Sequence, residues 1–218
     1  MSESAAIPVS APPIRKRPKP GERRVQILQA LATMLEQPGA ERVTTAALAA
    51  KLEVSEAALY RHFASKAQMF EGLIEFIEFT VFALVNQIAE RESANNSAEP
   101  GAGSGSGTRQ AARLVTMLMQ FSEKNPGMTR VMVGDALVFE NDRLTQRMSQ
   151  FFDKVEAALR QCLRDSAVQN GSSMPTVDAQ VASAVLTAFV VGRLQRYARS
   201  GFKRLPSENL DACLAQML

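Results

Sequence analysis

Apolar residues recur at three- and four-residue spacing along almost the whole chain, and this spacing limits the fold more than any other feature. Val25, Leu28 and Ala32 begin one such stripe, which continues to Leu35. A stripe of this period is the buried face of an amphipathic helix. β-Branched and aromatic residues do not alternate over any useful length, so strands are not expected. The sequence therefore predicts an all-α protein.

Breaks between the stripes divide the chain into predicted helices with short connections. These helices cover residues 22–37, 45–52, 56–62, 66–90, 109–124, 126–138, 142–168 and 177–200, followed by a short helix after Ser207. Thr44, Ser55 and Asn125 are placed to cap the helices that follow them. Ser65 and Gln68 form a capping-box pattern at the start of the long fourth helix.

Composition predicts three parts. Residues 1–20 hold five of the ten prolines, so we expect a disordered, basic, proline-rich arm. Residues 21–66 are predicted to form an N-terminal three-helix domain, and residues 67–218 a C-terminal helical domain, to which the family resemblance given below assigns dimerisation and partner binding. Within the latter, SANNSAEPGAGSGSG at 93–107 is predicted to be a flexible loop.

Positive charge is concentrated near the N-terminus. The net charge is +3, but RKRPKPGERR at residues 15–24 alone contributes +5, which leaves the rest of the chain slightly acidic. A basic arm on a nearly neutral body predicts a polyanion contact at one end of the molecule.

Other features indicate a cytoplasmic protein. Cys162 and Cys213 share no metal-ligand spacing and are expected to be reduced thiols rather than a disulfide. The longest apolar run, VASAVLTAFVVG at 181–192, is too short to span a bilayer, so no membrane segment is predicted. The N-terminus also lacks the order of a signal peptide.

His62 is the one histidine in the chain, and its surroundings argue against catalysis. A catalytic histidine needs an acid, a nucleophile or a second ligand, and the chain contains no HExxH, CxxC or GxSxG pattern. We therefore expect no enzyme activity, no metal and no cofactor. Phosphate contact or helix packing is the favoured role of His62.

The two short helices, TTAALAAKL and SEAALYRHF, are joined by three residues and suggest a helix-turn-helix. Leu48, Ala49 and Leu59, with Leu52, Val54 and Phe63, can form its small core against the first helix. The outward face of the second short helix then carries Glu56, Ala57, Tyr60 and Arg61, a mix of small and polar side chains that suits a DNA-reading helix.

Residues 23–75 resemble the TetR-type DNA-binding domain, with a Thr start, V-S after the turn, L-Y-x-H-F and S-K. Glu53 departs from the pattern, because the turn usually takes glycine; a left-handed glutamate costs about 1 kcal/mol. The resemblance and the helix-turn-helix geometry together imply two sets of DNA contacts. Ser55, Glu56 and Ala57 read bases, with Arg61 on the same outward face, and Thr44, Thr45, Tyr60, His62 and Lys66 meet the backbone. The charge pattern separately predicts that Arg15, Lys16, Arg17 and Lys19 of the arm add phosphate contacts.

The similarity continues through FSEKNPGMTRVM, ALVFENDRL and SGFKRLP, which resemble the SlmA-like nucleoid occlusion factors, a TetR-type family. The resemblance covers about residues 22–212. It implies a homodimer on palindromic double-stranded DNA that binds the C-terminal tail of the tubulin-like division protein FtsZ and blocks division-ring assembly over the nucleoid. Phe76, Met117, Gln120, Lys124 and Asn125 would line the FtsZ groove.

Several alternatives stay open on the sequence. Phe76 and Met117 also suit an ordinary helix-helix core. For the acidic stripe of Glu71, Glu75 and Glu78 the favoured interpretation is a solvated face, and contact with basic residues of the FtsZ tail is the second. The last long helix has small residues at Ala182, Ala184, Ala188 and Gly192 that permit a dimer interface or burial within one subunit. The main functional alternative is a TetR-type repressor released by a small apolar ligand.

Overall fold

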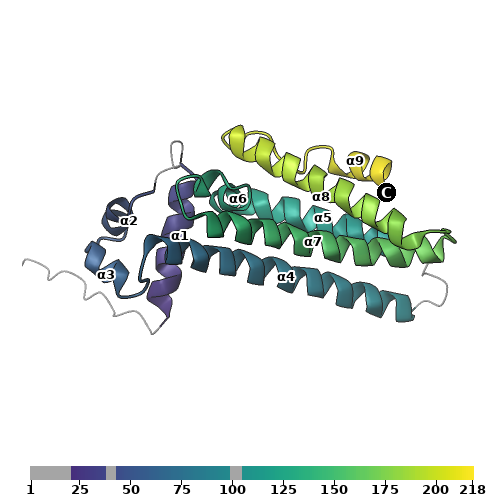
Figure 1. The fold of residues 1–218 in the computed structure, drawn as a ribbon, viewed down its shortest axis with the longest axis horizontal. Coiled ribbons are helices and arrows are strands. Elements are labelled where there is room, and N and C mark those ends of the chain that lie inside the picture. The colour runs from purple at the N-terminus through teal and green to yellow at the C-terminus, as the bar shows by residue number, and fades with distance from the viewer. Residues whose placement is uncertain (1–20, 38–42, 99–104) are drawn as a thin grey trace, which may run out of the picture.

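A computed structural model describes residues 21–37, 43–98 and 105–218. Over these ranges the chain forms helices and no strand, which confirms the all-α prediction. A small three-helix unit lies at one end of a bundle of long helices (Figure 1). The elements are α1 (Glu22–Leu35), α2 (Thr45–Lys51), α3 (Glu56–Tyr60), α4 (Lys66–Ala98), α5 (Ser106–Lys124), α6 (Pro126–Met132), the 3₁₀ turn η2 (Asp135–Leu137), α7 (Asp142–Gln169), α8 (Pro175–Arg199) and α9 (Leu210–Met217).

The three-helix unit has the predicted core. Leu48, Leu59 and Phe63 are each 1% exposed, and they belong to the same buried cluster as Leu31 of α1. The predicted stripe of α1 is wrong at its first residue: Val25 is 51% exposed. Ile27 is buried in its place, and the buried face of α1 runs through Ile27, Leu31 and Leu35.

The turn between α2 and α3 is tight despite its glutamate. Glu53 has a φ of 54°, in the left-handed region that favours glycine. Its N–H donates to the Ala50 carbonyl at 3.1 Å, and the Val54 N–H donates to the Ala49 carbonyl at 3.0 Å. The departure from the family pattern therefore leaves the turn intact, at the expected backbone strain.

Two of the predicted caps are confirmed and two are wrong. The Thr44 hydroxyl accepts from the Ala47 N–H at 3.1 Å. The Ser65 hydroxyl accepts from the Gln68 N–H at 3.2 Å, while the Gln68 side chain accepts from the Ala64 N–H at 2.8 Å. Ser55 and Asn125 occupy N-cap positions, but neither side chain makes a capping bond.

Three predicted boundaries are also wrong. The fourth helix does not end at residue 90 but continues to Ala98, because the chain has no helix breaker before Pro100. Ser106 and Gly107, expected in a flexible loop, are buried in the first turn of α5. The predicted helix over 126–138 ends at Met132, because Gly134 adopts a left-handed φ of 84° and η2 follows.

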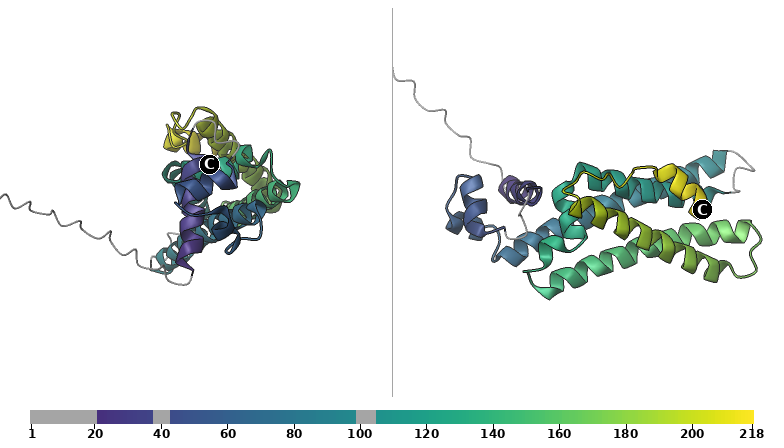
Figure 2. Two further views of the ribbon diagram at one scale, coloured as in Figure 1. Left: turned by 90° about the vertical axis from the view of Figure 1, so that its left-hand side faces the viewer. Right: turned by 90° about the horizontal axis from the view of Figure 1, so that it is seen from above.

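The long helices share one core. Ile77 and Val81 of α4, Leu118 of α5 and Phe151 of α7 are each fully buried in a single apolar cluster. The two further views show α7 and α8 running as an antiparallel pair on one side of the bundle (Figure 2). The two cysteines form no disulfide: Cys162 is buried, which raises the pKa of its thiol to about 11, and Cys213 is half-buried.

The prediction of no membrane segment considered only the longest uninterrupted apolar run, and two whole helices are longer than that run. Lys66–Ala94 and Pro175–Arg199 are long and apolar enough to cross a membrane, with mean hydropathies of 1.5 and 1.4. Core helices of water-soluble proteins pass the same test, so the test alone does not place either helix in a bilayer. Only 28% and 33% of these windows are buried within the chain, which leaves apolar surface for contacts with other molecules.

The three-helix unit is fastened to the bundle by close contact between α1 and α6. A Cβ atom at Gly127 of α6 would lie 1.9 Å from the backbone oxygen of Ala32 of α1. The Arg130 guanidinium, one turn further along α6, donates to the Gln37 carbonyl at 3.1 Å. The contact therefore needs a residue without a side chain at position 127.

We expect Gly127→Ala to lower the free energy of unfolding by about 3 kcal/mol or more, since the added methyl meets backbone that cannot move aside. The measurement is urea unfolding followed by circular dichroism. Gly171→Ala is the matched control, because a Cβ there meets nothing within 4 Å and costs only the strain of a φ of 74°. Equal losses for the two variants would contradict this account of the α1–α6 contact.

Candidate nucleic-acid and partner-binding sites

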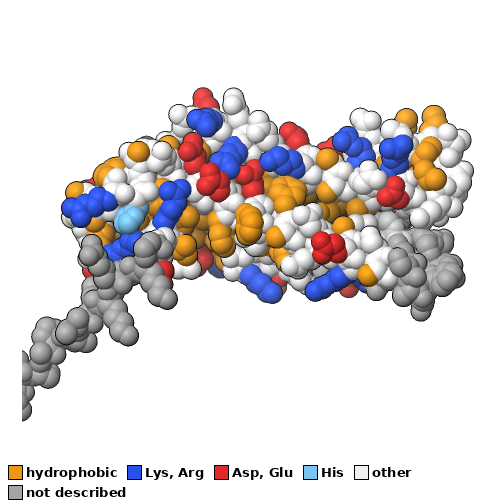
Figure 3. Space-filling view, turned by 90° about the horizontal axis from the view of Figure 1, so that it is seen from below, with side chains coloured by type: hydrophobic (Ala, Val, Ile, Leu, Met, Phe, Trp, Pro, Cys, Tyr) orange, Lys and Arg blue, Asp and Glu red, His pale blue; other side chains and the backbone are white. Residues whose placement is uncertain are grey.

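The outward face of α3 is open to solvent. Ser55, Ala57 and Tyr60 are exposed there, and Arg61 and His62 continue the same exposed surface past the end of the helix. In the space-filling view the histidine lies at the tip of the molecule among Lys and Arg side chains (Figure 3). The structure thus brings the predicted base-reading and backbone-contacting residues of α3 onto one basic surface.

Glu56 has a structural partner on that surface. The Thr45 hydroxyl, in the first turn of α2, donates to the Glu56 carboxylate at 2.6 Å. This bond ties the start of α2 to the start of α3, so it fixes the angle of α3 rather than leaving Glu56 free. Thr44 is already engaged in capping α2, although its exposed side chain remains accessible.

Arg24 was predicted only as part of a basic run, and the structure gives it a specific place. It lies in α1, its guanidinium is 4.3 Å from the centre of the Phe63 ring, and it donates to the His62 carbonyl at 3.4 Å. It therefore braces the end of the α3 surface. The other residues of the basic arm, Arg15, Lys16, Arg17 and Lys19, lie outside the described residues.

Lys66 begins α4 and is engaged by the C-terminal domain. Its ammonium forms an ion pair with Glu140, in the link between η2 and α7. The Lys66 side chain is 31% exposed and that of Glu140 is 9% exposed. A buried carboxylate of this kind depends on its cation, so a phosphate that recruited Lys66 would compete with Glu140.

The acidic stripe of α4 meets basic residues of α7. Arg147 donates to Glu78 at 2.7 Å and lies 3.6 Å from Glu75, and Lys154 lies 3.4 Å from Glu78. Burial opposes the charge on Arg147, but hydrogen bonds and charge from Glu78 and Glu75 outweigh it and raise the pKa of Arg147. The favoured interpretation of this stripe, a merely solvated face, is wrong, because these residues form an ion-pair network between α4 and α7.

The five predicted groove residues lie along α4, along α5 and at the end of α5. Phe76 is 46% exposed, Met117 is half-buried, and Gln120 and Lys124 are exposed. Burial of Phe76 in an ordinary core is thereby excluded. Asn125 does not face outward as a cap; its amide donates to the Phe121 carbonyl at 2.7 Å and closes the end of α5.

An open cavity of about 340 Å³ lies between α4 and α5 and is called the α4–α5 groove from here on. Its lining includes Met117 and Gln120 but not Phe76, Lys124 or Asn125. The structure thus joins two of the predicted residues in one hollow and leaves the other three outside it. The rest of the lining is Leu84, Gln87, Ile88 and Arg91 of α4 with Arg113 and Thr116 of α5.

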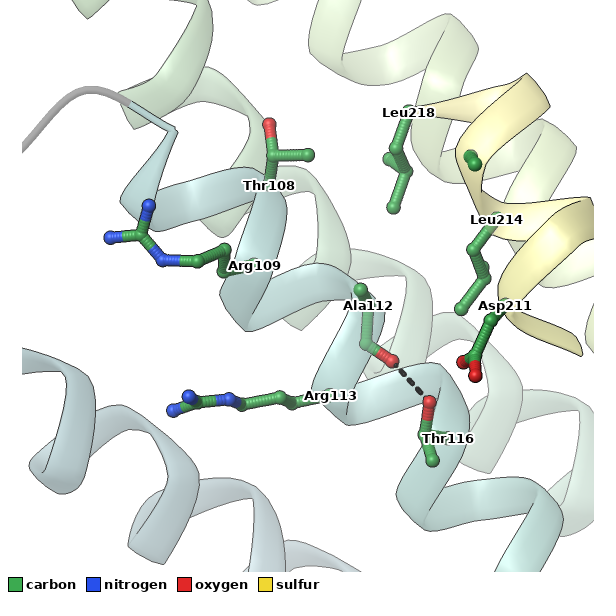
Figure 4. Close-up of a pocket in the computed structure, with 9 residues that line it drawn as sticks. Thr108, Arg109, Ala112, Arg113, Thr116, Asp211, Leu214 and Leu218 are labelled. Atoms are coloured by element: carbon green, nitrogen blue, oxygen red, sulfur yellow. Dashed lines mark hydrogen bonds between the residues drawn. The ribbon is translucent and has the colours of Figure 1, made fainter.

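A second cavity, of about 470 Å³, lies between α5 and α9. Leu214 of α9 and Leu218, which directly follows α9, point toward α5, whereas the Arg109 and Arg113 side chains leave α5 in the other direction (Figure 4). Arg113 forms an ion pair with Glu92, a carboxylate of α4 whose side chain is only 4% exposed. Arg113 therefore lies on the ridge between this cavity and the α4–α5 groove.

The outer face of α8 is apolar, and no described part of the chain covers it. Val177, Val181 and Val185 are 51%, 60% and 51% exposed, at a spacing that puts them on one side of the helix. Ala184 and Ala188 are also exposed, and a Cβ at Gly192 would meet nothing within 4 Å. Of the predicted small residues, Ala182 packs against the core of its own subunit, whereas Ala184 and Ala188 face outward with the valines.

Family models match both parts of the chain. The model described as bacterial regulatory proteins, tetR family, matches residues 27–73, and that described as tetracyclin repressor-like, C-terminal domain, matches residues 108–217. Nucleoid occlusion factor SlmA of Photobacterium profundum is 49% identical over 195 residues, which is 88% of this chain and 92% of the relative. This chain belongs to the SlmA family of nucleoid occlusion factors. The Vibrio cholerae relative is 49% identical over 191 residues, 87% of this chain and 90% of its own length.

Solved structures with the same fold are more distant in sequence. The fatty acid degradation regulator FadR from Bacillus halodurans has a TM-score of 0.69 at 14% identity, covering 92% of this chain and 96% of its own. A TetR-like regulator from Rhodococcus has a TM-score of 0.66 at 17% identity, covering 92% and 97%. These confirm the TetR-type fold. Family membership makes the protein a dimer-forming, cytoplasmic DNA-binding regulator rather than an enzyme.

We expect Glu140→Gln to strengthen binding to all DNA sequences, because it frees Lys66 for phosphate. With one additional phosphate contact per protomer, the plot of log affinity against log salt should steepen by about 2 for a dimer. The measurement is fluorescence anisotropy of a labelled duplex at several salt concentrations. In a Lys66→Gln background the same substitution should change nothing, and a gain that persists there would show that Glu140 acts on DNA by another route.

Proposed function

We propose that the protein binds palindromic chromosomal sites as a homodimer and, while bound, captures the C-terminal tail of FtsZ, which blocks assembly of the division ring over the nucleoid. The single observation that supports this most is the family match across both domains, at 49% identity over 88% of the chain. The open surfaces of α3, α8 and the α4–α5 groove supply the three contacts that such a function needs.

The DNA-reading surface is the N-terminal part of α3. Ser55 and Ala57 present a free hydroxyl and a small apolar group, which suit contacts to base edges in the major groove. Glu56 is engaged with Thr45, so we assign it to positioning α3 and not to base contact in the first instance. Tyr60, Arg61 and His62, with Thr44 and Lys66, would hold the sugar-phosphate backbone.

The dimer interface is the exposed stripe of α8 with the adjoining part of α7. Valines and small residues at Ala184, Ala188 and Gly192 permit close packing against the same face of a second subunit. An isologous contact of this kind places two reading helices about a twofold axis, which is the symmetry that a palindromic site requires.

The tail of FtsZ would lie in the α4–α5 groove. Leu84, Ile88 and Met117 give the groove an apolar floor. The exposed Phe76 extends this apolar surface toward the three-helix unit of α1, α2 and α3, which we call the reading domain. Lys124 lies at the C-terminal end of α5, where its free ammonium can attract acidic groups of the tail. Apolar contact with a charged rim is typical of grooves that bind short protein segments.

The competing proposal, a repressor released by a small apolar ligand, needs an enclosed site in the C-terminal domain. Large side chains of α4, α5 and α7 pack tightly there: Ile77, Leu118 and Phe151 are each 0% exposed. The two cavities described above, between α4 and α5 and between α5 and α9, are open at the surface of the bundle rather than enclosed. The observations therefore favour the FtsZ proposal.

We expect Lys124→Glu to weaken tail binding by roughly two- to tenfold, since it replaces an exposed attraction by a repulsion. Palindrome affinity should be unchanged, because Lys124 is absent from the α3 surface. The assay measures both affinities, with a labelled FtsZ tail peptide and a labelled duplex. Lys203→Glu, the same change at another exposed lysine, is the control. If both affinities fall together, or tail binding does not change, the groove assignment is wrong.

A further inference from the structure

The end of the α4–α5 groove that points away from the reading domain has a positive charge that no sequence pattern indicated. Arg91 of α4 and Arg113 of α5 both line it, and none of its eight lining residues is acidic. The other polar lining groups are the Gln87 and Gln120 amides and the Thr116 hydroxyl. Since Leu84, Ile88 and Met117 form the floor, the groove is apolar along its length and cationic at one end.

The two arginines differ in how they are held. Arg113 is anchored by the buried carboxylate of Glu92, yet half of its side chain, 52%, remains exposed. Its side chain leaves α5 away from α9 (Figure 4), as its pairing with Glu92 of α4 requires. Arg91 is exposed, and within the described part of the chain its side chain makes no hydrogen bond or ion pair. Glu92 offsets one of these two charges, so the end of the groove keeps a net positive charge carried by Arg91.

We propose that Arg91, supported by Arg113, binds a carboxylate of the segment that occupies the groove, so that the partner segment is apolar with an acidic residue toward this end. The inference rests on the proposed function, because it assumes that the groove holds the FtsZ tail. A carboxylate would neutralise the charge of Arg91 and accept hydrogen bonds from its N–H groups, since a guanidinium binds a carboxylate through two parallel N–H groups.

The spacing of the lining residues sets where that carboxylate lies in the segment. Leu84 and Arg91 are seven residues apart on one helix, about 10 Å along its axis. An extended peptide advances about 3.3 Å per residue, so the acidic residue should lie about three positions from the apolar side chain that contacts Leu84. This requirement is a property of the peptide and can be checked independently of the protein variants.

The test measures binding of synthetic FtsZ tail peptides to the DNA-bound dimer by fluorescence anisotropy. One peptide has the native sequence, and in each of the others one Asp or Glu is replaced by Asn or Gln. For the unmodified protein, one of these replacements, at the acidic residue that contacts Arg91, should weaken binding by about two- to fivefold, the range of an exposed ion pair. The other replacements should have no such effect. In the Arg91→Gln variant the same replacement should have no effect, because the two partners of one pair are coupled. Arg91→Lys should restore most of the difference, and Arg204→Gln, at an exposed arginine of the α8–α9 link, should behave as the unmodified protein.

The outcomes separate this inference from the proposed function. Suppose that Lys124→Glu weakens binding of the FtsZ tail, but Arg91→Gln changes the affinity for all peptides equally or not at all. The groove assignment then stands, and the arginine inference is overturned. If no tail peptide binds the unmodified protein, the proposed function fails and the inference falls with it. Loss of DNA affinity in Arg91→Gln without a change in peptide binding would make Arg91 a DNA contact and would also overturn the inference.

Discussion

The backbone contact between α1 and α6 holds the reading domain on the rest of the molecule. Gly127 lets α6 approach the Ala32 carbonyl closely, and Arg130 ties the Gln37 carbonyl to the same helix. The Arg130 guanidinium also lies 5.0 Å from the centre of the Phe202 ring, in the link that follows α8. Phe202 has a left-handed φ of 65°, so its place is fixed at a backbone cost. These contacts connect the three-helix unit to the helix proposed for dimerisation, so they set the distance between the two α3 helices of the proposed dimer.

Helix α4 also connects two parts of the molecule. It begins with Lys66 beside the three-helix unit and continues past Phe76 to Leu84 and Arg91, so one continuous helix joins the proposed DNA surface to the α4–α5 groove. Its ion pairs with Arg147 and Lys154 of α7 stiffen it against the bundle. The exchange of Lys66 between Glu140 and a phosphate is a physical means by which DNA could influence the C-terminal domain.

The helices and the helix-turn-helix could be predicted because their signals are local. Apolar periodicity, the Thr44 cap and the Ser65–Gln68 pair all act within one or two turns, and the structure confirms them. The predicted loop over 93–107 was wrong at both ends, since composition does not report that Ser106 and Gly107 pack into the bundle. Val25 was wrongly predicted to be buried, because the spacing of apolar residues fixes the direction of a helix's buried face only approximately.

Contacts between distant parts of the chain were beyond prediction from pattern. The pairing of Lys66 with Glu140 joins residues 74 positions apart, and that of Glu78 with Arg147 joins residues 69 apart. Neither spacing has a sequence signature. Arg91 and Arg113 likewise face one groove only because α4 and α5 pack side by side. The groove residues Phe76, Met117, Gln120, Lys124 and Asn125 came from family resemblance, and their role in binding stays a prediction.

The central claim is that DNA-bound dimers act on FtsZ. The most direct measurement is light scattering of FtsZ polymers assembled with GTP, in the presence of the protein and either a palindromic duplex recovered from the genome or a scrambled duplex of equal length. The account predicts that scattering falls with the palindromic duplex and is nearly unchanged with the scrambled one. Polymers that are unaffected by the protein in both mixtures would contradict it and would favour a local repressor released by a small ligand.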